Sequence, residues 1–189
     1  GLEVKEAIDV LSGRVSEKDP LYQVCMLLAS NMLIVSGLAE DEAEAGEKLT
    51  AALKEGRGLA RLEAMLTSLG ARDAGYVIAH PESLCQVQRK VEVCLDGEGY
   101  ICAMHAADIG NAAQMLGAGR AEKTDLIDPA VGLVMHKRMG DYVAEGEAVA
   151  TMYVNDDSRL DAAIGVLKGA IELGSERPAP APMVHGIVQ

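Results

Sequence analysis

The chain has 189 residues, of which 49% are hydrophobic, so it is long enough and apolar enough to bury a core. Its formal net charge of −12 argues against nucleic acid and anionic membrane surfaces as partners, because no stripe of Lys and Arg is available to displace counterions. The four cysteines show no Cys-x-x-Cys pairing, and we expect reduced thiols in a cytoplasmic protein.

The first part of the chain has helical spacing of apolar side chains in four segments. The first segment covers residues 2–12 and ends at Gly13, which suits a helix C-terminus. Because this helix has no cap before it, we expect that the sequence begins inside a longer protein. The third and fourth helices are expected over residues 40–55 and 59–69, and a glycine follows each of them.

The second helical segment, residues 21–35, is apolar on nearly every face. Asp19 suits its N-cap, and Pro20 suits its first turn, where a missing N–H costs nothing. Polar residues interrupt the run, and it falls short of a comfortable membrane span. We therefore predict a buried helix.

The remainder of the chain reads as short strands and helices around glycine-rich turns. The helical periodicity fades over residues 71–87, where His80 and Pro81 favour an extended connection. Strands are predicted at 91–93, 100–103, 131–135, around 143 and at 149–154, and helices at 106–116 and 160–171. We expect the first two strands to form a hairpin through the turn at residues 96–99.

Two further expectations concern the end of the chain. Asn155, Asp156 and Asp157 offer N-caps for the last helix. The proline-rich tail from Arg177 is expected to be extended and to dock as an edge strand through Val184, Ile187 and Val188.

Several polar clusters are explained better by backbone geometry than by catalysis. The segment Gly117-Ala118-Gly119-Arg120 resembles a phosphate cradle, but it follows a helix where a cradle follows a strand, which favours a helix C-cap. Asp125 and Asp128 adjoin turn residues and are interpreted as turn caps, with metal ligation as the alternative. The histidines lie far apart, without the spacing of metal ligands.

Residues 140–150 match the Gly-Asp-x-Val-x-x-Gly-Glu pattern of barrel-sandwich domains, which include biotinyl and lipoyl carriers. In those carriers a lysine at a hairpin tip is acylated. Here Lys137 precedes the turn, and the carrier tip sequence is absent. We therefore interpret Gly140 and Gly146 as positions of positive φ.

Three motifs together resemble one family, the pyrimidine-nucleoside phosphorylases, which include thymidine phosphorylase. The motifs are Leu2–Ile8; Leu116–Arg120 with Lys123 and Ile127–Gly132; and His136-Lys137 with Gly140-Asp141 and Gly146-Glu147. The resemblance is to the C-terminal portion of these enzymes and runs from Leu2 into the tail.

The resemblance implies an α+β fold, in which a helical segment over residues 1–70 is part of a large α/β domain. After a connection over residues 71–86, residues 87–176 would form a C-terminal module of α/β-hammerhead or barrel-sandwich-like arrangement. Residues 177–189 would be an extended tail.

The resemblance also implies an activity for the intact enzyme. Such enzymes are cytoplasmic homodimers that transfer a pentosyl group from a pyrimidine nucleoside to phosphate and require no organic cofactor. Their phosphate loop and base-binding residues belong to the region before this chain, so we expect no catalytic or substrate-binding residue here and no activity from the chain alone. One residue carries over: Glu6 matches a glutamate that helps to bind potassium in the bacterial enzymes.

Three possibilities stay open. The chain is either part of such an enzyme or a free-standing, non-catalytic binding or assembly module. The related nucleotide phosphorylases, which accept a nucleoside 5′-phosphate, are a third possibility, because the residues that choose the substrate lie outside this chain.

Overall fold

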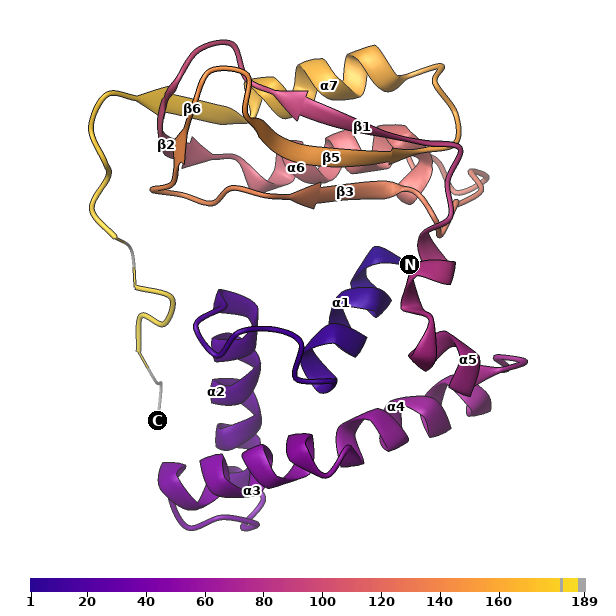
Figure 1. The fold of residues 1–189 in the computed structure, drawn as a ribbon, viewed down its shortest axis with the longest axis vertical. Coiled ribbons are helices and arrows are strands. Elements are labelled where there is room, and N and C mark those ends of the chain that lie inside the picture. The colour runs from indigo at the N-terminus through magenta and orange to yellow at the C-terminus, as the bar shows by residue number, and fades with distance from the viewer. Residues whose placement is uncertain (181, 187–189) are drawn as a thin grey trace. The chain divides into compact units, whose positions relative to one another are not determined.

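The computed structural model of the protein describes residues 1–180 and 182–186, which divide into two compact units. The helical unit runs from Glu3 to Ser83 and includes residues 182–186, and the sheet unit comprises Gly1–Leu2 and residues 84–180. Figure 1 shows the ribbon, in which helices α1 to α5 come first along the chain and the strands follow. Within the described chain, no helix has the length and the apolar character that crossing a membrane requires.

Four helices of the helical unit agree with the predictions, and the caps explain where they begin. Asp19 accepts a hydrogen bond from the Leu21 N–H at 2.8 Å, and Asp41 accepts one from the Glu44 N–H at 2.9 Å. In Figure 1, α3 and α4 follow one another almost in line. The helices are α1 (Leu2–Leu11), α2 (Pro20–Val35), α3 (Glu42–Lys54), α4 (Arg57–Ser68) and α5 (Ala74–Ala79).

The fifth helix corrects the expected extended connection over residues 71–87. Asp73 caps α5 by accepting a hydrogen bond from the Tyr76 N–H at 2.8 Å, and Pro81–Cys85 then forms a 3₁₀ turn. With six residues, α5 is too short for an apolar stripe to repeat, so periodicity does not reveal it.

The second helix is present as predicted, but its predicted burial is wrong. Of its sixteen residues only Ser30 is buried, although the helix contains no charged residue. Val35 is 88% exposed and Met32 is 71% exposed. A helix that is apolar on every face is typically buried. The described residues, however, cover only part of the surface of α2.

The sheet unit contains two antiparallel three-stranded sheets, with strand orders β1-β5-β3 and β4-β2-β6. Helices α6 (Ala106–Ala113) and α7 (Leu160–Gly169) pack against each other, and Figure 1 shows both behind the strands. The strands are β1 (Arg89–Cys94), β2 (Gly99–Met104), β3 (Gly132–Met135), β4 (Tyr142–Val143), β5 (Ala148–Val154) and β6 (Ile171–Gly174).

The predicted strands are confirmed, but the predicted hairpin between the first two is wrong. β1 pairs with β5, whereas β2 pairs with β4 and β6 in the other sheet. The turn after β1 contains Gly97 and Gly99 with φ of +106° and +152°. A glycine-rich turn therefore carries the chain from one sheet to the other, and the turn composition alone does not distinguish this crossing from a hairpin.

The last helix begins at Leu160, as predicted, but it ends earlier than expected, at Gly169. Its N-cap is Arg159, so the predicted caps Asn155, Asp156 and Asp157 are wrong, and Asp156 instead accepts a hydrogen bond from the Ser158 N–H. Ile171, expected on the helix, begins strand β6 because the free edge of β2 provides backbone partners for it.

The expected edge strand of the tail is not formed at Val184, which lies outside any strand. Ile187 and Val188 lie outside the described residues.

One continuous core holds the sheet unit together. Fifteen buried residues from both sheets, from α6 and α7 and from adjoining turns form a single cluster that includes Ile101, Met152 and Leu167, all fully buried. The expected α+β class is confirmed. Within residues 84–180 the two sheets remain separate and do not close into a barrel.

Candidate functional site

Glu6, the one residue predicted to bind a metal, lies exposed on α1. Among the residues that the structure describes, its side chain has no hydrogen-bond or ion-pair partner, and no group of three His, Cys, Asp or Glu side chains is placed to hold a metal ion. One carboxylate holds a monovalent cation weakly, because such ions need several oxygen ligands. The potassium role of Glu6 therefore stays a prediction that requires ligands from elsewhere.

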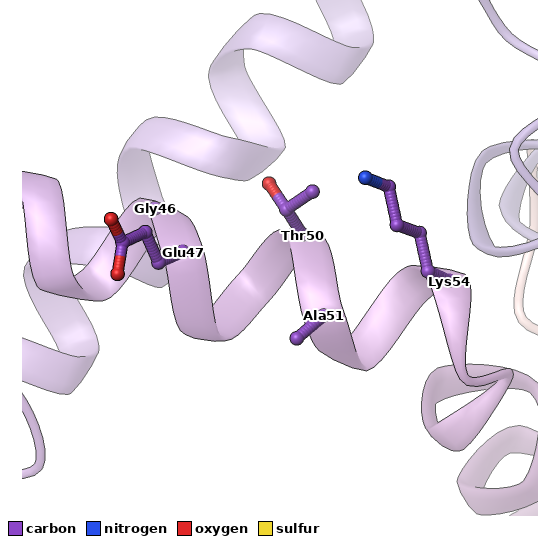
Figure 2. A pocket seen from close by; sticks show the side chains of 5 residues that line it. All are labelled: Gly46, Glu47, Thr50, Ala51 and Lys54. Atoms are coloured by element: carbon purple, nitrogen blue, oxygen red, sulfur yellow. The ribbon is translucent and has the colours of Figure 1, made fainter.

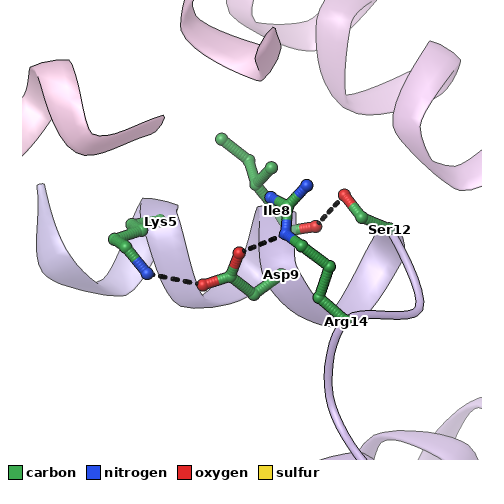
Figure 3. Close-up of polar contacts among 5 residues, drawn as sticks. All are labelled: Lys5, Ile8, Asp9, Ser12 and Arg14. Atoms are coloured by element: carbon green, nitrogen blue, oxygen red, sulfur yellow. Dashed lines mark hydrogen bonds and ion pairs between the residues drawn. The ribbon is translucent and has the colours of Figure 1, made fainter. Parts of the chain in front are cut away.

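The polar contacts of α1 centre on Asp9 (Figure 3). Its two carboxylate oxygens accept hydrogen bonds from Lys5 Nζ and Arg14 Nε, each at 2.7 Å. Partial burial acts to raise the pKa of Asp9, but the hydrogen bonds from Lys5 and Arg14 outweigh it and hold the pKa below its ordinary value. The cluster joins the helix to the turn after it, and Ser12 Oγ caps the Ile8 carbonyl beside it.

The glycine-rich segment after α6 is built as a helix end. The helix widens into a π turn over Gln114–Ala118, and Gly117 has a φ of +102°, which a residue with a Cβ rarely adopts. The Gly117 carbonyl accepts a hydrogen bond from the Asp128 N–H at 3.0 Å, and Arg120 is exposed. The predicted structural role of this segment is confirmed.

Both aspartates of the loop that follows act on the backbone, as predicted. Asp125 Oδ2 accepts from the N–H groups of Ala121 and Glu122 at 3.0 and 2.9 Å. Asp128 Oδ1 accepts from the Ala130 N–H at 2.9 Å.

Asn155 links this loop to the first sheet, a contact that sequence reasoning missed. Its Nδ2 donates to Asp128 Oδ2 at 2.7 Å, and its Oδ1 accepts from the Gln88 N–H at 2.9 Å. The three residues lie 27 and 67 positions apart in the sequence, so no local pattern signals the link. Asn155 therefore fixes the entry to β1 against the loop after α6.

The hairpin around Gly140 and Gly146 is held by Lys137. The Lys137 Nζ lies 2.6 Å from Glu147 Oε1 and donates to the Tyr142 carbonyl at 2.9 Å, and the side chain is 20% exposed. Hydrogen bonds from Lys137 and from the Ala144 N–H lower the pKa of Glu147. A lysine held in this way closes the hairpin and is not presented for acylation. Both glycines have positive φ, +85° and +75°, as predicted.

The remaining reactive side chains are dispersed. His80 lies near Glu82 at 3.4 Å, His105 near Glu172 at 3.5 Å, and His136 Nε2 lies 2.7 Å from Thr151 Oγ1. The four cysteines are free, as predicted. No pair of these groups forms the acid and base of a catalytic site in the described part of the chain.

A shallow groove lies along α3 (Figure 2). Its lining residues are Gly46, Glu47, Thr50, Ala51 and Lys54. All of them belong to one helix, so no second element closes the groove around a ligand. It lacks the convergent polar groups of a binding site.

The sheet unit contains the part of the chain that a family model matches. Residues 100–174, from β2 to β6, match the family model described as the pyrimidine nucleoside phosphorylase C-terminal domain. The pyrimidine-nucleoside phosphorylase motifs in the loop after α6 and in the Lys137 hairpin lie within the matched range.

Similarity to pyrimidine-nucleoside phosphorylases extends across both units. The chain is 36% identical over 187 residues to the pyrimidine-nucleoside phosphorylase of Staphylococcus aureus (strain USA300) and 34% identical to that of Bacillus subtilis (strain 168). In each case the match covers 99% of this chain and 42% of the relative. The predicted resemblance to the C-terminal portion of this family is confirmed, and the chain spans less than half the length of these relatives.

Proposed function

We propose that this chain is the C-terminal part of a pyrimidine-nucleoside phosphorylase. The observation that carries the proposal is the similarity of 99% of the chain to enzymes of which it spans 42%. The intact enzyme transfers a pentosyl group from a pyrimidine nucleoside to phosphate, giving the free base and a pentose 1-phosphate. The chain alone is inactive, because the groups for this chemistry lie in the unmatched part of the relatives.

The chemistry defines what the rest of the enzyme must supply. Phosphate needs an anion cradle of backbone N–H groups and cationic side chains, and the departing base needs hydrogen-bond donors. The sugar passes through an oxocarbenium-like state, which requires precise positioning of both reactants. Among the described residues, Asp128 and Lys137 of the family motifs are engaged in a turn and a hairpin, where they contact backbone groups of the chain itself.

In this proposal the chain has a mechanical role. The sheet unit, with its own core, is a rigid body that supports the large domain and its closure over the substrates. Glu6 supplies one potassium ligand, and the intact enzyme is a cytoplasmic homodimer. Each of these features belongs to the whole enzyme and is a proposal for this chain.

Phosphorolysis of uridine and thymidine tests the proposal. The purified chain is incubated with each nucleoside, with and without inorganic phosphate, and release of the free base is followed. We expect no release by the chain and phosphate-dependent release by the full-length protein. Base release by the chain itself would locate a complete site within these residues, and an inactive full-length protein would contradict the enzymatic assignment.

A further inference from the structure

The helix α2 carries an exposed apolar stripe whose members share one face of the helix. The stripe residues are separated by three, four and three positions, the spacing that aligns side chains along a helix. The residues are Cys25, Leu28, Met32 and Val35, and the last three are 59%, 71% and 88% exposed. We name these four residues the α2 stripe.

The composition of α2 is that of an interior helix. Its sixteen residues include no Asp, Glu, Lys or Arg, whereas 24% of the whole chain is charged. Surfaces of transient partners carry a polar rim, whereas permanent internal interfaces resemble a domain core cut in half. A contiguous apolar face without a single charge therefore indicates permanent burial.

The helical unit also lacks a core of its own that would use this face. Apart from Ile8 and Val10, the buried apolar residues of its described part are small: Ala39, Ala45, Ala74 and Pro81. The large side chains that a core requires are instead on the surface, among them Leu28 and Met32. The unit is therefore one layer of a larger packed structure.

We infer that the α2 stripe is an internal packing surface covered, in the full-length enzyme, by the polypeptide that lies outside the matched 42% of the relatives. The inference rests on the proposed function, because that function implies the additional polypeptide. The amount of unmatched chain favours this occupant, since more than half of each relative is available to cover the face. A second copy of the chain is an outcome that the test distinguishes.

The rate of methionine oxidation measures whether the α2 stripe is covered, and it does not depend on enzymatic activity. The chain and the full-length protein are treated with dilute hydrogen peroxide, and sulfoxide at each methionine is measured by peptide mass spectrometry. Met152, fully buried in the sheet unit, and Met139, 55% exposed, provide the protected and reactive references. We expect Met32 to oxidise like Met139 in the chain and at least about tenfold more slowly in the full-length protein, because burial excludes the oxidant.

A charge substitution gives an independent test. Met32→Glu should leave the thermal midpoint of the chain unchanged and lower that of the full-length protein, because only there would the charge be buried. Gln23→Glu is the matched control: it adds the same charge to an exposed position on the opposite side of α2 and should be neutral in both.

Equal oxidation of Met32 in both proteins would overturn the inference. Protection of Met32 in the isolated chain would also overturn it. If that protection increased with the concentration of the chain, a second copy of the chain would be the occupant. Protection of Met32 in a full-length protein that does not phosphorolyse uridine or thymidine would support the packing surface and contradict the proposed function. A full-length protein that phosphorolyses uridine or thymidine but whose Met32 still oxidises readily would support the proposed function and contradict the packing surface.

Discussion

The two units of the chain differ in how completely they bury their large apolar side chains. In the sheet unit, fifteen buried residues from strands, helices and turns form one cluster, and large side chains such as Ile101 and Met152 are fully enclosed. In the described part of the helical unit, few apolar residues are buried and three of them are alanines, while Met32 and Val35 are exposed. The helices have good local signals, including aspartate caps, but the described chain contains little of the packing that such helices need. A regular element is thus not by itself a sign of a complete core.

The largest expected effect comes from comparing two methionines, one in each unit. Met152→Ala removes a fully buried side chain from the middle of β5 and should lower the free energy of unfolding by about 2–5 kcal/mol. Met32→Ala, at a position 71% exposed, should change it by less than about 0.5 kcal/mol. Urea unfolding followed by circular dichroism measures both variants. Similar losses would mean that the two units do not differ in burial as described.

These two residues also show how far sequence reasoning reaches. An apolar run after the turn at Gly146 correctly predicts β5, and an apolar helical run correctly predicts α2, because both patterns are local properties of the sequence. Burial is not local: it depends on which other elements the chain supplies, and the same pattern leaves Met152 enclosed and Met32 exposed. The prediction of strand pairing fails for the same reason, since β1 pairs with β5, which lies more than fifty residues later in the sequence.

The candidate site follows the same division. The turn roles of Asp125 and Asp128 are predictable, because each accepts a hydrogen bond from a backbone N–H only a few residues away. The link from Asn155 to Asp128 and Gln88 is not, because its ends meet only in the folded structure. Of these residues, only Asp128 lies within a family motif, and the motif does not state what it contacts.

A glycine in the sheet unit gives the next largest effect. Gly99 opens β2 with a φ of +152°, and a Cβ there would lie 2.7 Å from the Gly174 carbonyl oxygen of β6. Gly99→Ala should therefore cost about 1–3 kcal/mol of unfolding free energy. Gly13→Ala, a positive-φ glycine of the helical unit with nothing near its Cβ position, separates the conformational part of the cost from the clash. Denaturant midpoints measure both, and an equal loss in the two variants would exclude a contribution from the β2–β6 contact.

The Asn155 link predicts a smaller loss, confined to the sheet unit. Asn155→Ala removes the donor to Asp128 and the acceptor for the Gln88 N–H, which should cost about 1–2 kcal/mol. Amide hydrogen exchange should show faster exchange at Gln88 and in the loop after α6, while α3 is unaffected. Asn111→Ala, which removes a 3.4 Å contact to Asp108 within α6, is the control. Unchanged exchange at Gln88 would show that Asn155 does not hold the loop to the sheet.

The smallest effect is a pH dependence at the Lys137 hairpin. The hydrogen bond from Lys137, followed by that from the Ala144 N–H, holds the pKa of Glu147 below its ordinary value. The folded state therefore binds this proton less readily than the unfolded state, so the contribution of Glu147 to stability is complete above the ordinary pKa and is lost as the pH falls through the folded pKa.

An NMR titration of the Glu147 carboxyl carbon measures this pKa directly. Lys137→Met should move the pKa upward toward the ordinary value, with part of the shift retained because the Ala144 N–H still donates to the carboxylate. Lys168→Met, which removes a lysine paired with Asp96 elsewhere in the sheet unit, should leave the pKa of Glu147 where it is. If Lys137→Met also left the pKa of Glu147 unchanged, the Lys137–Glu147 ion pair would not contribute to holding the hairpin. The stability of the sheet unit would then depend on its apolar core and not on this ion pair.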